Sequence, residues 1–345
     1  MQFSHFLSSY YPDTNYPAKS LFNDMLDQAR LAEQLGYSGV SVPEHHFMNI
    51  LMNPAPLQMA VKVASITQRI AITTAVLVLP FYDLKRLAGE IAVADILCDG
   101  RLVLGVGRGA FGYEFERFGV PEDETRAKFD EAMQALQLLL TEKEVSWQGK
   151  YFQFDKLTIM PRPMTQPMPE MMIAALAPEA IYHCAKRGLH VQTTPLQGSA
   201  DLLQQQADAF VRGVEERGEA GKSQRLSLLR VAFAARDEDD AKAKQKLAYE
   251  YYKRFDNVFT GPGEIENGAT APLSRKQSVE ELAENLLIGT PEQMIEKLKT
   301  YEAAGIHEVN LNMNIGAEPQ ETLESMHRFA EEVLPYFDSA LTEAA

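Results

Sequence analysis

Short apolar runs alternate with amphipathic stretches along almost the whole chain. The runs have the length and composition of strands, and the stretches place apolar residues three and four positions apart, as helices do. We predict eight strands, at Phe3–Ser8, Gly39–Val42, Ala71–Leu79, Arg101–Val106, Met171–Leu176, His190–Thr194, Leu226–Ala235 and Glu308–Asn314. We predict helices at Ser20–Leu35, Pro56–Thr67, Asp83–Leu97, Thr125–Leu140, Pro178–Arg187, Ala200–Arg217, Glu238–Tyr252, Pro291–Ala304 and Pro319–Tyr336.

This alternation predicts an α/β fold with a parallel sheet, because parallel neighbours need a crossover connection. The strands are almost continuously apolar, as expected when helices cover both faces of a sheet. About eight strands and eight helices is the count of a (β/α)8 TIM barrel, so we predict one such domain over residues 1–345. An open doubly wound sheet is the competing fold. It is disfavoured because no Gly-x-Gly-x-x-Gly follows the first strand.

Two segments depart from the alternation. Val145–Phe154 reads as an inserted hairpin that turns at residues 148–150. Asn257–Glu280 contains three glycines and two prolines and has neither a helical nor a strand period. A long loop of this kind in a compact domain is usually a lid or a disordered connection. Because it lies close to the predicted site face, we predict a mobile lid over about residues 257–280.

Composition and charge narrow the function. The formal net charge is −15, which repels nucleic acid and anionic membranes, so neither is an expected partner. Cys98 and Cys184 are the two cysteines, too few for a disulfide framework or a cysteine-rich metal site, and we expect both to be buried. The chain begins without a secretory pattern and has no apolar run of bilayer length, so a cytoplasmic protein is expected.

The candidate chemistry lies at strand ends, where barrel enzymes place their active sites. Glu44-His45-His46-Phe47 follows the second strand. Histidine suits general acid/base catalysis because its ordinary pKa is close to neutrality. Adjacent residues of an extended segment point to opposite sides, so His45 and His46 are not expected to share a metal ion, and we predict no metal site.

Arg108 stands between Gly107 and Gly109 after the fourth strand. Glycines let the backbone approach a ligand closely, and a guanidinium can bind a phosphate group through two hydrogen bonds. Alternatively, Arg108 could form a structural ion pair with a neighbouring glutamate, which is an equally good interpretation. The sequence alone leaves the two open.

Together these residues resemble the luciferase-like flavin-dependent monooxygenases, and among them most of all the alpha subunit of bacterial luciferase. The similarity runs from Met1 to about Phe337. It is carried by residues 29–37 (ARLAEQLGY), 44–47 (EHHF), 75–80 (AVLVLP), 99–109 (DGRLVLGVGRG) and 288–292 (IGTPE). Several motifs in the same order over the whole chain are more specific than any one of them.

The resemblance implies a monooxygenase that uses reduced FMN from a separate flavin reductase. Oxygen would add at C4a of the flavin, and the resulting peroxide would oxidise a small lipophilic organic substrate. The resemblance also implies that the family's catalytic histidine is His45, that its phosphate-binding arginine is Arg108, and that its non-proline cis peptide beside the flavin is Ala75-Val76.

Some positions differ from the family pattern. The luciferase cysteine beside the arginine is Gly107 here, which leaves room for flavin. A Glu-Ser pair and a threonine that help to hold FMN align with Leu176-Ala177 and Ala180, so hydroxyl groups are missing at the phosphate end. Backbone N–H groups of the following helix could bind the phosphate instead. Trp147, the one tryptophan, lies in the hairpin, so light emission is not expected.

Two other functions stay open. One is a deazaflavin-dependent oxidoreductase on the same fold, and the other is a non-catalytic flavin-binding partner subunit. Small residues in the segment 88–94 (AGEIAVA) permit close helix packing in the region through which the family dimerises, so we expect a homodimer.

Overall fold

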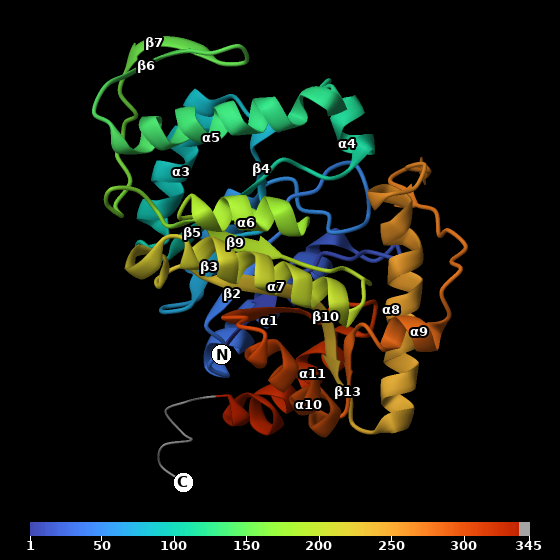
Figure 1. Cartoon of the computed structure of the whole chain (residues 1–345). Coiled ribbons are helices and arrows are strands. Elements are labelled where there is room, and N and C mark those ends of the chain that lie inside the picture. Colours follow the sequence, from blue (N-terminus) through green and yellow to red (C-terminus); the bar gives the residue numbers. More distant parts are fainter. Residues whose placement is uncertain (338–345) are drawn as a thin grey trace.

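The predicted strands pair in parallel and close into a ring (Figure 1). The computed structural model describes residues 1–337. In chain order the ring consists of β1 (Gln2–Phe6), β2 (Gly39–Val42), β3 (Ala71–Thr74), β5 (Leu102–Gly107), β8 (Met171–Ala174), β9 (His190–Thr193), β10 (Leu226–Ala234) and β14 (Glu308–Asn312). Each strand pairs with the next, and β14 pairs with β1. The predicted (β/α)8 barrel is therefore confirmed.

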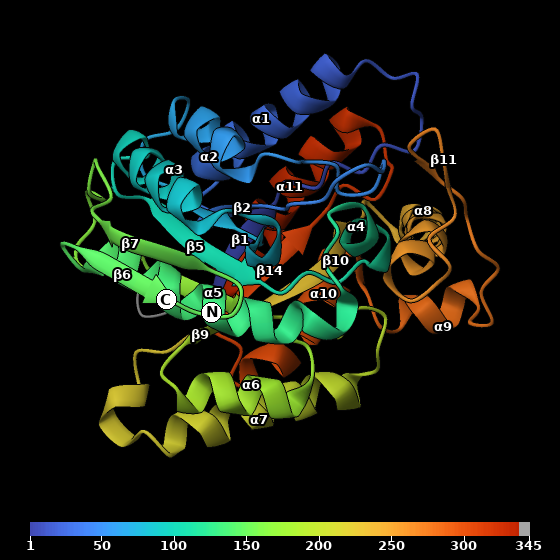
Figure 2. The same ribbon diagram turned by 90° about the horizontal axis from the view of Figure 1, so that it is seen from above.

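Helices surround this ring, as Figure 2 shows from above. They are α1 (Ala18–Gln34), α2 (Pro56–Ala64), α3 (Leu84–Leu97), α5 (Thr125–Thr141), α6 (Pro178–Lys186), α7 (Ala200–Glu215), α8 (Glu238–Phe259), α10 (Pro291–Ala303) and α11 (Pro319–Glu332). Local sequence explains their starts. Asp83 caps α3 by accepting from the backbone N–H groups of Lys85 and Arg86, and four of the helices begin with proline at the first position.

The buried apolar residues form two separate hydrophobic cores. The larger core fills the space between strands and outer helices and includes Val40, Leu104 and Leu311. The smaller core lies under the loops at the carboxyl ends of the strands and includes Phe6, Phe111 and Phe255. This second core gives the loops a rigid base, which a site built on loops requires.

The third predicted strand is wrong in its length. Residues 71–79 form β3 and the short β4 (Leu77–Val78), separated by a cis peptide bond between Ala75 and Val76, and a 3-10 turn begins at Leu79. β3 pairs with the start of β5, and β4 pairs with its end at Gly107. A continuous apolar run does not reveal such a break.

The segment predicted as a structureless loop is partly regular. Helix α8 continues to Phe259 because Phe255 and Val258 extend its buried stripe beyond Tyr252. A hairpin of β11 (Ile265–Glu266) and β12 (Ala269–Thr270) follows, and α9 (Val279–Ala283) begins before the segment ends. The prediction that residues 257–280 lack regular structure is therefore wrong.

The inserted hairpin is confirmed as β6 (Val145–Gln148) and β7 (Gln153–Leu157). The carboxylate of Glu131 on α5 accepts hydrogen bonds from three backbone N–H groups of its turn, at residues 150–152. Two further elements, α4 (Gly112–Arg117) and β13 (Leu287–Gly289), are not among the predicted ones. Both are short, and α4 proves important for the site.

Candidate functional site

The sequence-predicted residues gather at the carboxyl ends of neighbouring strands. Val42 at the end of β2 pairs with Thr74, and Val78 of β4 pairs with Gly107. Val106 pairs in turn with Ile173 of β8. The loop with His45, the bond Ala75-Val76, the segment Gly107-Arg108 and the residues after β8 thus follow adjacent strands.

His45 is held by a buried carboxylate that the sequence analysis did not identify. Its Nδ1 lies 3.2 and 3.3 Å from the two carboxylate oxygens of Glu114 on α4, and the imidazole stacks on Phe111 at 4.1 Å between ring centroids. A carboxylate oxygen accepts, so this contact favours the tautomer in which Nδ1 of His45 carries the hydrogen and Nε2 is the acceptor. The His45 side chain is 16% exposed, so a ligand at the strand ends can reach it.

Glu114 also fixes the backbone of the same loop. Its Oε1 accepts a hydrogen bond of 2.6 Å from the N–H of His46, and its side chain is fully buried. One carboxylate thus orients the ring of His45 and the peptide that follows it. The only sequence signal for this residue was a carboxylate in a largely apolar stretch after the fourth strand, which is too common to single it out.

His46 points to a different carboxylate. Its Nε2 lies 2.9 Å from Oε1 of Glu44, and the other oxygen of Glu44 accepts from the N–H of Val78 at 2.9 Å. Burial and the Glu44 carboxylate raise the pKa of Tyr82, so that hydroxyl stays protonated. Glu44 therefore ties the His45–His46 loop to the strand that follows the cis peptide.

The two histidines thus do not converge on one point. Among residues 1–337 no three histidine, cysteine, aspartate or glutamate side chains are grouped closely enough to hold a metal ion. Cys98 and Cys184 are both free and buried, as expected. Over the same residues, no helix combines the length and the apolar character that a membrane crossing requires.

The peptide bond between Ala75 and Val76 is cis, which confirms that expectation. Gly107 lies against it. A Cβ atom at Gly107 would stand 2.5 Å from Cγ2 of Val76 and 3.7 Å from Cβ of Ala174. The space that a side chain would fill at Gly107 is therefore taken up by Val76, and the role of this glycine toward flavin remains a prediction.

Arg108 extends from this edge into solvent. It is exposed, and it forms no hydrogen bond or ion pair with any residue in the described part of the chain. The alternative in which it pairs with a neighbouring glutamate is thus not what the structure shows. An arginine without an internal partner at the end of a barrel strand is available to an anionic ligand.

The residues after β8 form an open, apolar rim. Ala174, Leu176 and Ala177 are all exposed, and Leu176 retains 37% of its surface. Ala177 is the N-cap of α6 and Pro178 at the first position has no N–H, so the first free backbone N–H groups of this helix are those of Glu179 and Ala180.

The segment 257–280 lies against the loop that carries His45. The N–H of Thr270 donates to Oδ1 of Asn49 at 2.9 Å. The buried Asn257 closes the segment on itself, since its side chain donates to the carbonyls of Glu264 and Ala271 and accepts from the N–H of Glu264. The segment 257–280 thus lies near the site, and its role as a mobile lid remains a prediction.

Comparison with known proteins gives a consistent result. Residues 1–308 match the family described as luciferase-like monooxygenase. The oxygenase component of a flavin-dependent trigonelline monooxygenase from Acinetobacter baylyi is 29% identical, with 99% of this chain and 96% of that protein covered. The alpha chain of alkanal monooxygenase from Photorhabdus luminescens is 22% identical, with 97% of each chain covered.

Solved structures show the same fold. The crystal structure of the monooxygenase RslO1 from Streptomyces bottropensis superposes with a TM-score of 0.85 at 25% identity, covering 98% of this chain and all of that one. A type II Baeyer-Villiger monooxygenase from Pseudomonas putida, solved in complex with FMN, superposes with a TM-score of 0.78 at 17% identity and covers 97% of this chain and 98% of its own.

The barrel, the residues at its strand ends and the match over most of the sequence agree. This chain is an enzyme that belongs to the luciferase-like monooxygenase family.

Proposed function

We propose that this monooxygenase uses reduced FMN and O2 to oxidise a small organic substrate at the carboxyl ends of β2, β3, β5 and β8. The observation that carries the proposal is the joint placement at these ends of a carboxylate-held histidine, a non-proline cis peptide and an unpaired arginine. When bound, reduced flavin supplies the electrons that activate O2.

The residues present fit FMN. Arg108 has no hydrogen-bond or ion-pair partner among residues 1–337 and would provide a bidentate donor for the phosphate group, and α6 begins after the neighbouring strand β8. Ala75, Val76, Gly107, Leu176 and Ala177 offer backbone and small apolar surface to the ring and side chain of the flavin. The rim lacks a carboxylate that would repel the phosphate at residues 174–178, although Glu179 follows in the first turn of α6.

His45 is the proposed catalytic residue. Because Glu114 holds the hydrogen on Nδ1, Nε2 faces the reacting groups as a base and, once protonated, as an acid. The stacked Phe111 limits rotation of the imidazole, and partial burial keeps bulk water from the ring. Glu114 is a positioning residue, since it acts through His45 and the peptide of His46.

We further propose that a separate flavin reductase supplies the reduced FMN. The trigonelline enzyme is named as an oxygenase component, which implies such a partner for that protein. The names of relatives also give the first substrates to test here: trigonelline, an alkanal and 2,5-diketocamphane.

We also propose a homodimer that forms through α3. The small residues Ala88 and Ala92 face the protein's own core, where they are fully buried. The outer face of the helix instead carries Val93, Ile96 and Leu97, which are 42%, 38% and 54% exposed. An exposed apolar stripe of this kind is typical of a surface that a partner covers. Light scattering after size exclusion should give twice the chain mass, and Val93→Glu should give a monomer.

Cofactor choice is tested by titrating the protein anaerobically with reduced FMN, reduced riboflavin and a reduced deazaflavin. We expect FMN to bind most tightly and to support oxygen-dependent product formation from at least one test substrate. Tighter binding of the deazaflavin, with hydride transfer in the absence of oxygen, would support the deazaflavin-dependent alternative. Flavin binding without turnover on any substrate would favour a non-catalytic partner subunit.

A further inference from the structure

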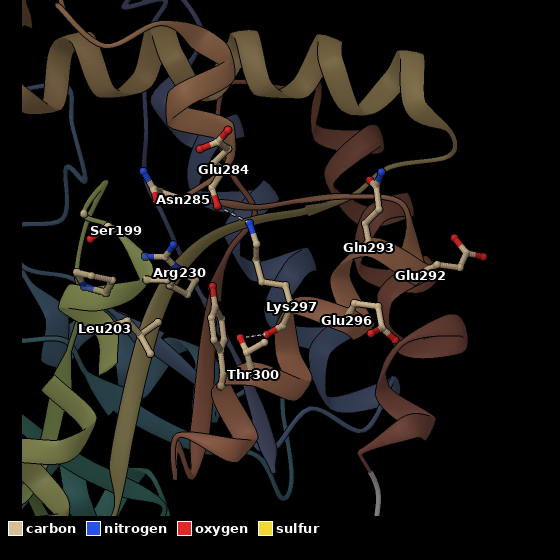
Figure 3. Close-up of a pocket in the computed structure, with 14 residues that line it drawn as sticks. Ser199, Leu203, Arg230, Glu284, Asn285, Glu292, Gln293, Glu296, Lys297 and Thr300 are labelled. Carbon is tan, nitrogen blue, oxygen red and sulfur yellow. Dashed lines mark hydrogen bonds between the residues drawn. The ribbon is translucent and has the colours of Figure 1, made fainter. Parts of the chain in front are cut away.

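A cavity of about 630 Å³ lies outside the barrel, between β10 and the helices α7 and α10 (Figure 3). It is lined by the turn before α7 and the start of that helix, by one side chain of β10, by Glu284 and Asn285 before β13, and by the first three turns of α10. None of the residues that we assign to flavin or to catalysis lines it. Its volume is ample for a small organic molecule.

Arg230 brings an uncompensated charge to this cavity. The residue is 3% exposed, and among residues 1–337 no carboxylate forms an ion pair with it. Its Nη1 donates to the carbonyl of Leu196 at 3.0 Å, while Nε has no partner. A buried guanidinium with free donors is costly unless something negative completes it.

Lys297 places a second cation in the same cavity. Its Nζ donates to the carbonyls of Glu284 and Leu286, both at 2.7 Å, and within the described residues it has no ion-pair partner. Burial, reinforced by the charge of Arg230, lowers the pKa of Lys297 to about 8. The two cations thus disfavour each other, and an anion between them would relieve both.

The start of α7 adds backbone donors. Ser199 is the N-cap of this 16-residue helix, and its side chain makes no capping bond. In Figure 3 the Arg230 side chain lies between Ser199 and Lys297, whereas Glu292 and Glu296 point away from Arg230. The positive end of the helix dipole and both cations therefore line the same part of the cavity.

We infer that this cavity is a second ligand site, which binds the oxyanion head of a small molecule through Arg230, Lys297 and the N-terminus of α7. The head is a phosphate or a carboxylate group, and Pro195, Leu203 and Tyr301 provide an apolar wall for the body of the molecule.

The site is separate from the proposed flavin site. Arg230 belongs to β10, and β14 and β1 lie between that strand and β2, which leads to His45. β9 lies between β10 and β8, whose carboxyl end forms the flavin rim. A ligand bound by Arg230 therefore does not compete with FMN for Arg108.

Sulfate is the best probe because its charge is constant with pH. Calorimetric titration at pH 7, with chloride at equal ionic strength as the blank, should show saturable binding. Lys297→Gln should weaken it at least tenfold, Lys297→Arg should restore it, and Lys222→Gln, which removes an exposed lysine elsewhere, should have no effect. Arg108→Ala should keep this sulfate site, which distinguishes it from the flavin phosphate site.

A pH series gives a second readout. Arg230 of β10 and Glu284 before β13 are the charged groups that act on Lys297, and Glu292, Glu296 and Tyr301 of its own helix also line the cavity. With a pKa of about 8 in the free protein, sulfate should bind about tenfold more weakly at pH 9 than at pH 7, and Lys297→Gln should abolish this difference.

Competition then identifies the head group. Displacement of sulfate by inorganic phosphate assigns a phosphate group, and displacement by succinate assigns a carboxylate. The inference is overturned if sulfate shows no saturable binding above chloride, if neither competitor displaces it, or if folded Lys297→Gln binds it as the natural protein does.

Discussion

Replacing Glu114 by glutamine changes one charge at the centre of the site and leaves its volume almost unchanged. The glutamine oxygen can still accept from the N–H of His46, but an amide NH2 group replaces the oxygen that lies 3.3 Å from Nδ1 of His45, so that a donor opposes the Nδ1–H there. The imidazole loses the partner that fixes its orientation and tautomer. Glu114→Gln therefore tests whether this carboxylate serves the chemistry through His45.

The contacts set the expected magnitudes. Glu114 is fully buried and makes charge-assisted hydrogen bonds to two groups, so exchanging them for one neutral bond should cost about 1–3 kcal/mol of unfolding free energy. A misoriented general base lowers turnover much more, and we expect kcat to fall about ten- to a hundredfold. FMN affinity should change less than twofold, because Glu114 is not among the residues assigned to the cofactor.

Urea unfolding, FMN titration and steady-state product formation with reduced FMN measure the three quantities. Glu116→Gln is the matched control, since Glu116 lies on the same helix with its side chain 80% exposed and, within residues 1–337, forms an ion pair with Arg117 alone. That variant should stay within about 0.5 kcal/mol and keep its turnover. Normal turnover of folded Glu114→Gln would refute the positioning role, and a loss fully explained by unfolding would reduce Glu114 to a structural residue.

Three further predictions concern the cofactor, pH and the segment near the site. Arg108→Ala should weaken FMN binding about ten- to a hundredfold and leave the binding of riboflavin, which has no phosphate group, unchanged. Stability should also stay the same, because the arginine has no partner among residues 1–337. An equal loss of affinity for both flavins would contradict the phosphate role. Burial lowers the pKa of His5 to about 4, so the stability that the neutral imidazole contributes is present above pH 6.5 and is lost as the pH falls toward 4. Urea unfolding should therefore show an unfolding free energy about 2 kcal/mol lower at pH 5 than at pH 7. The same dependence of unfolding free energy on pH in His5→Asn would disprove this. Asn257→Ala removes three hydrogen bonds within the segment 257–280 and should make this segment at least tenfold more sensitive to limited proteolysis. Asn15→Ala, at an exposed position, is the control. Equal cleavage rates in Asn257→Ala and the natural protein would show that Asn257 does not order the segment.

The sequence predicted the barrel because strands and helices differ in hydrophobic period and alternate regularly. All eight ring strands were found, since each is a buried run bounded by turn residues. The break between β3 and β4 was visible only through family resemblance, because the cis bond lies in an unbroken apolar run. The end of α8 was placed too early, since Phe255 and Val258 were not recognised as a continuation of its buried face.

The site was predicted unevenly for a physical reason. His45 and Arg108 stand directly after strands, so their position in the sequence indicates their place in the barrel. Glu114 reaches His45 across 69 residues through a six-residue helix, and Arg230 meets Lys297 across 67 residues outside the barrel. Such contacts between residues far apart in the sequence depend on how the elements pack, which the local pattern of a sequence does not encode.

The most direct test of the proposed function compares the natural protein with His45→Ala under a flow of reduced FMN from a flavin reductase. The account predicts oxygen-dependent product formation by the natural protein on at least one of the named test substrates. It predicts a loss of at least a hundredfold in His45→Ala, with FMN affinity largely kept. Undiminished product formation by folded His45→Ala would contradict the account.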